Sequence, residues 1–428
     1  MLSLTRAGCW CAIGVMAMGS LHGLAVAAPM PPDSVTALAG PLTLDRALAL
    51  TTRYGLNLKA AGLRSEAARA RVADANRLQN PTLIATEENF GGDLGGSRRE
   101  ATLALGQVFE LGGDRGARRA TAEAEAGLAS AEAGLVGREA QAMTAERFIT
   151  AWSLQGRVGR LREGERLAGQ AVVAARERHQ AGASPELEVL RARSRATSQA
   201  VERQRNDSEL DIARRELALS WGATEATFDS LAGPGPFPGD SANGARSPHL
   251  THPELSRATA AEAVAAARIQ SAEAGRTPDL TLSAGVRRLE EVSGAGFVVG
   301  VALPLPLWGQ QSGGLAAAHM ELAASTAERR ATEQRLQLAL VAATERMRVA
   351  AALLDTLRLR VQPAREELVG EMLRGYREGR TSYLDLVAEQ GGLLETDLEI
   401  VEAEANLWRV RLRLDQLTGS GPLAPKGE

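Results

Sequence analysis

Apolar residues recur at helical spacing over unusually long stretches of this chain. From 336 to 361 they follow a 4-3 spacing without a miss, and from 386 to 414 leucine or isoleucine returns every seven residues. Such heptads are typical of helices that pack along their whole length, and alone they favour an ordinary coiled coil. The pattern predicts two very long helices, each followed after a glycine by a return helix: 114–180 with 185–221, and 310–377 with 382–417. Pro363 should kink the second long helix.

Two other regions alternate with the period of two residues that β-strands show. In 279–303, Leu280 and Leu282 alternate with Thr281 and Ser283, whereas the alternation in 81–109 is weaker. Each segment is near the roughly 9–11 residues that cross a bilayer as a tilted strand. A soluble sheet packed on helices would look the same, so both interpretations stay open. Four strands cannot close a membrane barrel, so in a membrane several chains must pool their strands.

The order helix, β-hairpin, long helix and return helix occurs twice. Gly182 and Glu188 are matched 197 residues later by Gly379 and Asp385, and Pro81 is matched at the same offset by Pro278. With one residue of slippage, Leu111-Gly-Gly also matches Leu307-Trp-Gly. We therefore predict a tandem duplication with these parts: a first repeat at 28–222, a linker at 223–251, a second repeat at 252–419 and a tail at 420–428.

The first residues are typical of a secretory signal peptide, expected over 1–27. Arg6 precedes a mostly apolar segment at 8–24, and Ala25-Val-Ala is a cleavage pattern. An uncleaved anchor is the alternative. Both cysteines, Cys9 and Cys11, lie in this segment, so we expect a mature chain without disulfides, thiol catalysis or thiolate metal sites.

Composition and motifs argue against an enzyme or a nucleic-acid binder. The formal net charge is −3, which does not fit a generally basic protein that binds nucleic acid. The sequence has no phosphate loop, nucleophile elbow or H-E-x-x-H motif. His249 and His252 have only Glu254 as a near partner and are interpreted as solvated linker residues. We expect no catalytic residues, no metal site and no cofactor.

The two glycine-broken turns between long and return helices carry the most informative residues. Gly182 and Gly379 permit the left-handed conformation that ends a helix. Ser184 and Thr381 stand at equivalent places and are expected to cap the next helix. Glu188 and Asp385 each lie six residues after their glycine. From the residues alone, both acids can be explained as favouring a helix N-terminus through its dipole.

Several local motifs resemble one known family. They are Leu-Thr-Leu-Asp-Arg-Ala-Leu at 42–48, Asn-Pro-Thr-Leu at 80–83, Phe-Glu-Leu-Gly-Gly-Asp-Arg at 109–115 after Glu-Asn-Phe-Gly-Gly at 88–92, and Pro-Leu-Pro-Leu at 304–307. With the repeated element order they resemble the TolC-type outer-membrane factors over nearly all of 40–420. The motifs at 88–92, 109–115 and 304–307 resemble the cobalt–zinc–cadmium resistance branch more than the drug or protein-secretion branches.

The resemblance implies a mainly α fold with a small β part. Each chain would give a homotrimer four transmembrane β-strands of a 12-stranded barrel, above a long coiled-coil α-barrel, in the outer membrane of a Gram-negative bacterium. It implies the exit duct of a tripartite RND-type efflux system for heavy-metal cations. Its partners would be a periplasmic adaptor protein, an inner-membrane RND pump and outer-membrane lipid. A multidrug or type I secretion duct, and a non-channel periplasmic coiled-coil scaffold, remain the alternatives.

The resemblance also implies roles for the two turns. They would be periplasmic tips on which the adaptor docks, through these residues: Gly182, Ser184, Pro185, Leu187, Gly379, Arg380, Thr381, Tyr383 and Leu384. Three more would constrict the periplasmic aperture: Glu188, Tyr376 and Asp385. A second acid that the family carries at this tip falls on Ala388, so this constriction would be built differently.

Overall fold

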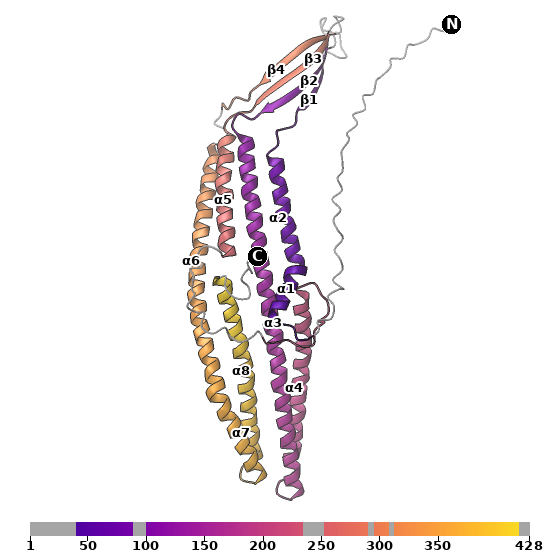
Figure 1. Cartoon of the computed structure of the whole chain (residues 1–428), viewed down its shortest axis with the longest axis vertical. Helices are drawn as coiled ribbons and strands as arrows, with labels where there is room; N and C mark the ends of the chain where they lie inside the picture. The colour runs from indigo at the N-terminus through magenta and orange to yellow at the C-terminus, as the bar shows by residue number, and fades with distance from the viewer. Residues whose placement is uncertain (1–39, 89–99, 234–251, 290–294, 308–311, 419–428) are drawn as a thin grey trace, which may run out of the picture.

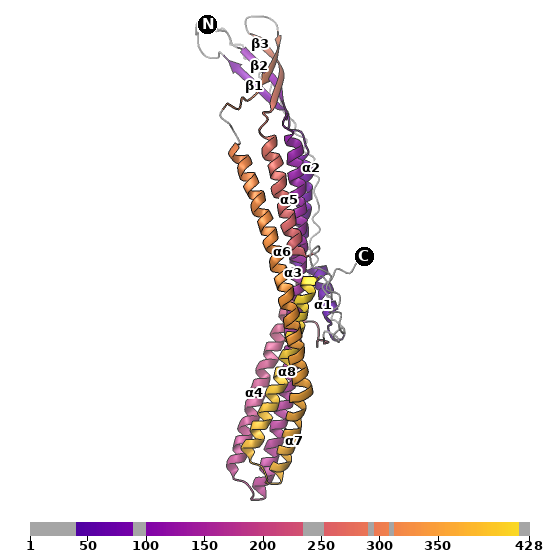
Figure 2. The same cartoon turned by 90° about the vertical axis from the view of Figure 1, so that its left-hand side faces the viewer.

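The chain forms one long rod of helices with a small β-sheet at one end and two helical hairpins at the other (Figures 1 and 2). The computed structural model describes residues 40–88, 100–233, 252–289, 295–307 and 312–418. The predicted fold class, mainly α with a small antiparallel sheet, is confirmed. The expected signal peptide, most of the linker and the C-terminal tail lie outside the described residues. Within the described part, no helix is both long and apolar enough to cross a membrane.

The first repeat consists of four helices and two strands. In chain order they are α1 (Leu44–Tyr54), α2 (Leu56–Ala75), β1 (Thr82–Glu88), β2 (Glu100–Phe109), α3 (Asp114–Gln180) and α4 (Glu186–Leu219). Helix α3 is continuous over 67 residues, which corresponds to about 100 Å.

The second repeat follows the same order, except that the single helix α5 stands in place of α1 and α2 and that its long helix contains an irregularity. Its elements are α5 (Pro253–Ala274), β3 (Leu280–Leu289), β4 (Ala295–Ala302), α6 (Ser312–Thr356), the π-helix η4 (Leu357–Val361), α7 (Gln362–Arg377) and α8 (Tyr383–Thr418). Pro363 lies in the first turn of α7. The irregularity expected at this proline is therefore a π-helical turn just before it.

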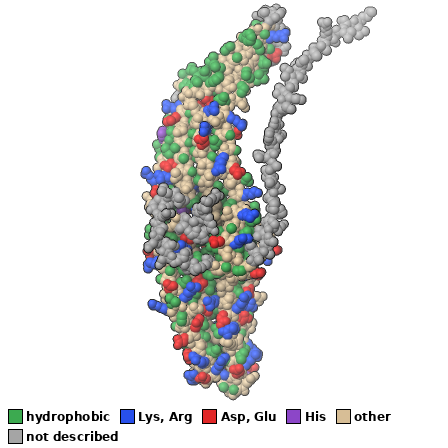
Figure 3. All heavy atoms as spheres, in the orientation of Figure 1, with side chains coloured by type: hydrophobic (Ala, Val, Ile, Leu, Met, Phe, Trp, Pro, Cys, Tyr) green, Lys and Arg blue, Asp and Glu red, His purple; other side chains and the backbone are tan. Residues whose placement is uncertain are grey.

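The four strands form one antiparallel sheet in the order β1-β2-β3-β4. Their register places large apolar side chains on one face, where they are exposed: Leu83, Leu103, Leu105, Val286, Phe297, Val299 and Val301. Figure 3 shows hydrophobic side chains over the sheet. The opposite face carries small and polar residues such as Thr102, Ser283 and Gly285. There Arg287 donates to Thr102 Oγ1 (3.1 Å) and Glu100 Oε2 (3.2 Å).

The helices lie side by side in a curved layer four helices wide. Nearest the sheet, contacts join them in the order α2–α3–α5–α6, and toward the tips in the order α4–α3–α8–α7. The heptad residues of α6 and of the start of η4 face those of α8: Ala350, Leu354 and Leu357 pack with Ile400 and Leu407. The heptad pattern in the sequence therefore corresponds to the packing contact between these two helices.

The main core lies halfway along the rod, where α1 and the start of the linker wrap α3. Leu42, Trp221, Phe228 and Leu231 are each at most 4% exposed there. The side-chain amide of Gln155 on α3 donates to the Leu231 carbonyl and accepts from the Leu231 N–H, both at 3.0 Å. Because Gln155 satisfies both backbone groups of Leu231, the linker is fixed to the long helix.

Candidate functional site at the helical tips

Both tip turns close in the same way. Gly182 and Gly379 have φ of +70° and +79°, in the left-handed region expected for them. The Ala183 N–H donates to the Arg178 carbonyl at 2.8 Å, and the Arg380 N–H donates to the Gly375 carbonyl at 2.7 Å. Each bond spans five residues across the glycine, as in a Schellman motif. The two turns therefore match each other down to individual backbone hydrogen bonds.

The expectation that Ser184 and Thr381 cap the return helices is wrong. Helix α4 begins after Pro185 with no side-chain cap, and Ser184 Oγ has no hydrogen-bond partner in the described part of the chain. Thr381 Oγ1 instead donates back to the Met372 carbonyl at 3.1 Å. The capping residue of α8 is Ser382, whose hydroxyl accepts from the Asp385 N–H at 3.2 Å. Helix α8 therefore begins at Tyr383, one residue later than predicted.

Tyr376 and Glu188, two of the three predicted aperture residues, are in direct contact. The Tyr376 side chain is 1% exposed, and its hydroxyl donates to Glu188 Oε2 at 3.0 Å. Burial, and then this bond to a carboxylate, raise the pKa of Tyr376 far above its ordinary value. The phenol is therefore a permanent donor that ties α7 to α4.

Arg178, near the end of α3, supports Tyr376 from a second side. Its Nη1 donates to the Tyr376 carbonyl at 2.6 Å, and its guanidinium lies 4.9 Å from the centre of the Tyr376 ring. Its Nη2 also donates to the Ala183 carbonyl at 3.2 Å. Arg178 thus links both tip turns. No specific sequence signal marks Arg178 beyond a basic residue in the last turn of a helix.

Asp385, the third predicted aperture residue, does not join this contact. Its carboxylate accepts from the Ser382 hydroxyl at 2.7 Å and lies exposed in the first turn of α8. Within one chain Asp385 therefore serves as part of a helix cap. Its negative charge remains open to solvent.

The predicted docking residues separate into exposed and buried ones. Leu187 is 52% exposed and Leu384 is 60% exposed, and both lie at equivalent places just after a turn. Arg380 is exposed and pairs with Glu378. Tyr383, however, is only 4% exposed and packs 6.0 Å, centroid to centroid, from the Tyr376 ring. The Tyr383 side chain therefore belongs to the tip core and not to the exposed surface of the turn.

A shallow groove of about 270 Å³ runs between the two turns. Its lining includes Glu177 and Arg178 from α3 together with Arg377 and Glu378 from the end of the second long helix. Acidic and basic groups alternate across it, so the groove carries no strong net charge. Such a surface suits polar contacts with another protein better than the capture of a small ion.

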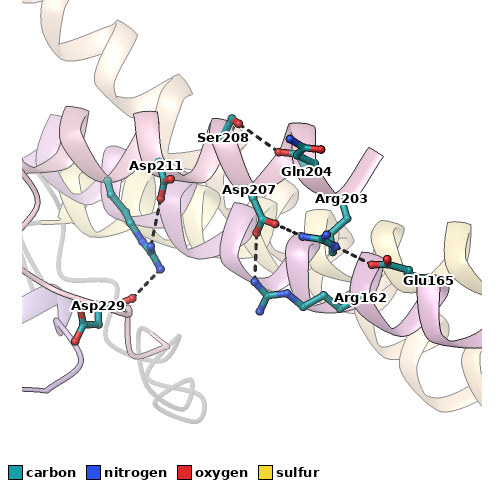
Figure 4. A network of polar contacts seen from close by, with 9 residues as sticks. Arg162, Glu165, Arg203, Gln204, Asp207, Ser208, Asp211 and Asp229 are labelled. Carbon is teal, nitrogen blue, oxygen red and sulfur yellow. Dashed lines mark hydrogen bonds and ion pairs between the residues drawn. The ribbon is translucent and has the colours of Figure 1, made fainter. Parts of the chain in front are cut away.

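An ion-pair network further up holds α4 on α3 (Figure 4). Arg203 donates to Glu165 at 2.7 Å and to Asp207 at 2.5 Å, and Arg162 reaches Asp207 at 3.3 Å. Toward the middle of the rod, Arg214 donates to the Asp229 carbonyl at 2.8 Å. These partly exposed pairs fix how the two helices are aligned more than they stabilise them.

The described residues contain no group of three or more His, Cys, Asp or Glu side chains that could hold a metal. His252 accepts a 3.2 Å hydrogen bond from the Glu254 N–H through Nδ1, and so caps α5. Burial lowers its pKa below the ordinary value. The candidate site is therefore a pair of tips with a tyrosine-centred contact between them.

The fold, the tips and the sequence define the class of protein. A family model described as "Outer membrane efflux protein" matches residues 249–420. Two curated relatives are at least 30% identical and are covered over more than two thirds of their length. The chain belongs to the outer membrane efflux protein family, whose members are channels and not enzymes, and it is an outer-membrane protein.

The curated relatives carry metal-resistance names. The chain is 28% identical over 383 residues to the cobalt-zinc-cadmium resistance protein CzcC of Cupriavidus metallidurans, covering 89% of this chain and 91% of that protein. It is 30% identical over 324 residues to the nickel-cobalt-cadmium resistance protein NccC of Alcaligenes xylosoxydans xylosoxydans, covering 74% of this chain and 69% of that protein.

Solved structures of channels share the fold. The outer-membrane channel OprN superposes with a TM-score of 0.74 at 19% identity, covering 89% of this chain and 90% of that one. The outer membrane protein VceC of Vibrio cholerae superposes with a TM-score of 0.72 at 18% identity, covering 88% and 96%. At these identities the likeness concerns the fold alone.

Proposed function

We propose that this protein is the exit duct of a tripartite RND-type efflux system and that heavy-metal cations are its cargo. One observation carries the proposal. Among the described residues, the sheet and both helix layers each have four elements and two unpartnered edges. Strands β1 and β4 are the edges of the sheet, α2 and α6 those of the upper helices, and α4 and α7 those of the lower helices.

Unpaired strand edges are not tolerated in lipid, so the sheet must be completed by other copies. Three copies would supply 12 strands, above the minimum of about 8 that a membrane barrel needs. The same operation would close both helix layers into a hollow cylinder. Large apolar side chains are exposed on these edge helices, as such an assembly requires: Val201, Ile212 and Leu219 on α4, and Leu338 and Val341 on α6.

The tips are the periplasmic end of this duct. Leu187 and Leu384 offer one apolar anchor on each turn, and Arg380 offers a charge beside them, which supports docking of a periplasmic adaptor. Glu188 and Asp385 from three chains would bring six carboxylates to the tunnel mouth. Such a ring attracts cations and repels anions. The adaptor would link the duct to an inner-membrane RND pump, which supplies the energy.

The cargo is inferred from the relatives. Their names specify resistance to cobalt, zinc, cadmium and nickel, and the alignment with CzcC covers about nine-tenths of both chains. A duct for organic drugs or for a secreted protein would have the same fold. The motifs of the metal branch favour the metal cargo.

The test is growth of a strain without the gene on graded Zn²⁺, Co²⁺, Cd²⁺, Ni²⁺, Cu⁺ and Ag⁺, beside a panel of dyes and antibiotics. We expect selective metal sensitivity that the gene restores and the empty vector does not. Drug sensitivity with normal metal tolerance would instead indicate that the duct exports organic compounds. Recovery of the protein as a soluble periplasmic monomer, instead of heat-resistant trimers in the outer membrane, would contradict the duct itself.

A further inference from the structure

The π-helical turn η4 distinguishes the second repeat from the first. Over Leu357–Val361 the hydrogen bonding changes, so that the Gln362 N–H donates to the Leu357 carbonyl five residues back. The flanking residues stay helical, and the turn does not end the helix. In the first repeat α3 covers the equivalent length as uninterrupted α-helix. A π-turn inside an α-helix accommodates one extra residue.

The sequence contains that extra residue. Gly182 follows Gly113 by 69 residues, whereas Gly379 follows Gly309 by 70 residues. These are the equivalent glycines before each long helix and in each tip turn. The second long helix is therefore one residue longer than the first between the same two landmarks.

Burial along the helix changes phase at the same place. Ala350, Leu354 and Leu357 are buried with the 4-3 spacing. Continued past positions 361 and 364, that spacing would place Leu368 and Gly375 in the core, but Leu368 is only partly buried and the buried Gly375 has no side chain to pack. The large side chains that are buried are instead Val369 and Tyr376, each one residue later. The π-turn thus absorbs the extra residue and brings Tyr376, not Gly375, to Glu188.

Side chains on α8 hold the π-turn at both of its ends. Gln362 Nε2 donates to Oδ1 of the buried Asp397 at 2.7 Å, and Arg358 pairs with Glu404. Pro363 has no N–H to donate and its ring obstructs the carbonyl four residues back, so it disfavours an uninterrupted α-helix here.

The first repeat lacks the proline and the aspartate. At the positions 197 residues earlier, Arg166 stands in place of Pro363 and Ala200 in place of Asp397. The π-turn therefore occurs together with Pro363 and Asp397 in the second repeat alone, whereas the pair of Arg358 and Glu404 has a counterpart in Arg162 and Asp207 of the first repeat.

We propose that the π-turn holds one extra residue whose release lets α7 turn about its axis and break the contact between Tyr376 and Glu188; this inference rests on the proposed function. If η4 becomes α-helical, the extra residue passes down to the exposed tip turn beside Gly379. Helix α7 then rotates by about 100° and shifts by about 1.5 Å. Gly375 takes the place of Tyr376, and with no side chain it cannot bond to Glu188. The gate opens by a change of register.

The test deletes the extra residue without changing any buried side chain. Leu359 is 74% exposed in the middle of the π-turn. Its deletion should give an uninterrupted α-helix that keeps Tyr376 on Glu188 but has no second register. Purified trimers with the deletion should keep their melting temperature, yet open several-fold less often in planar bilayers. Leu359→Ala, which keeps the chain length, is the matched control and should open like wild type. Equal opening of the two variants would overturn the proposal.

A second variant acts in the opposite direction. Pro363→Ala keeps the chain length and restores the missing N–H, so it should favour the α-helical register and raise the opening frequency. If the deletion variant does not assemble, this variant decides, and an unchanged opening frequency overturns the proposal.

A labelling experiment measures the rotation of α7 without depending on whether the protein forms pores. In a chain with Cys9 and Cys11 replaced by serine, Val369→Cys should react with a maleimide more slowly when Leu359 is deleted than when it is Leu359→Ala. The reason is that rotation of α7 exposes position 369. Equal rates would overturn the register change. A wild-type protein that forms no pores would instead overturn the proposed function and leave the labelling result valid.

Discussion

The Tyr376 hydroxyl lies 3.0 Å from Oε2 of Glu188, although 188 residues separate them along the chain. The bond joins α7 of the second repeat to α4 of the first. Around it the buried Tyr376 ring packs against Tyr383, and Arg178 holds its backbone carbonyl. The two hairpins of one chain are therefore joined at the tip by contacts centred on Tyr376.

Tyr376→Phe should favour the open aperture. The variant keeps the ring and its packing but loses one hydrogen bond to a charged group, which is worth about 1.5–3 kcal/mol when well buried. Glu188 is partly exposed, so we expect the low end, roughly a tenfold change in the ratio of closed to open channels. Single-channel recording in planar bilayers measures this ratio.

Tyr383→Phe is the matched control, because the Tyr383 hydroxyl has no hydrogen-bond partner among the described residues. It should leave the ratio unchanged. An equal effect of both variants would show that tip packing, and not the bond to Glu188, controls the aperture.

Asp385→Asn should weaken the block of the channel by multivalent cations. Asparagine keeps an acceptor for the Ser382 hydroxyl, so the cap of α8 survives while the negative charge is lost. Titration of the bilayer current with a trivalent cation measures the block. Ser382→Ala, which weakens the cap but keeps the charge, should leave the block in place, and the reverse pattern would assign Asp385 to the helix cap alone.

Residue patterns predicted the long elements well because a helix of many heptads repeats its signal. The 4-3 spacing from Leu336 to Val361 corresponds to the seam between α6 and α8. The pattern stops at Val361 because the phase shifts by one residue there. From sequence, the nearby Pro363 suggested a kink, since a π-turn has no residue signature of its own.

Contacts between distant segments were harder to predict. The cap at Ser382 differs by one residue from the expected Thr381, a shift set by the bond from Thr381 to the Met372 carbonyl. Arg178 was missed because its partners are backbone carbonyls, which any sequence supplies. That Tyr383 is buried depends on how four helices meet at the tip, which no local pattern records.

Val299→Arg should prevent stable insertion of the sheet into the membrane. Val299 is 78% exposed on the apolar face of β4, and an arginine on a lipid-facing strand costs about 2–4 kcal/mol at the bilayer midplane. The yield of heat-resistant trimers in the outer-membrane fraction measures insertion.

The neighbouring Val298→Arg is the control, because successive residues of a strand point to opposite faces and Val298 lies on the face with Gly285. Its trimers should form. Equal loss for both variants would contradict the assignment of the apolar face to lipid.

Gly112→Ala should disrupt the junction between β2 and α3. A Cβ at this position would lie 2.2 Å from the Ala274 carbonyl oxygen and 2.9 Å from Cβ of Thr277, so the two repeats would have to move apart. Trimers should become heat-sensitive. Gly134→Ala, in the interior of α3 with no atom within 4 Å, should instead be neutral or stabilise the helix by up to about 1 kcal/mol. Equal stability of the two variants would contradict the close approach at Gly112.

Asp415 near the end of α8 should make the stability of the protein depend on pH. Its side chain is 3% exposed, and burial raises its pKa from 3.8 to about 6 even though the Arg411 guanidinium lies 3.1 Å away. Between these values the folded protein holds a proton that the unfolded chain has lost. The contribution of this group to stability therefore falls as the pH rises from about 4 to 6, by about 3 kcal/mol, and is constant above. Asp415→Asn should remove this dependence. Melting temperatures of both proteins at pH 4.5 and pH 7 test it, and an identical pH slope in the variant would assign the dependence to other groups.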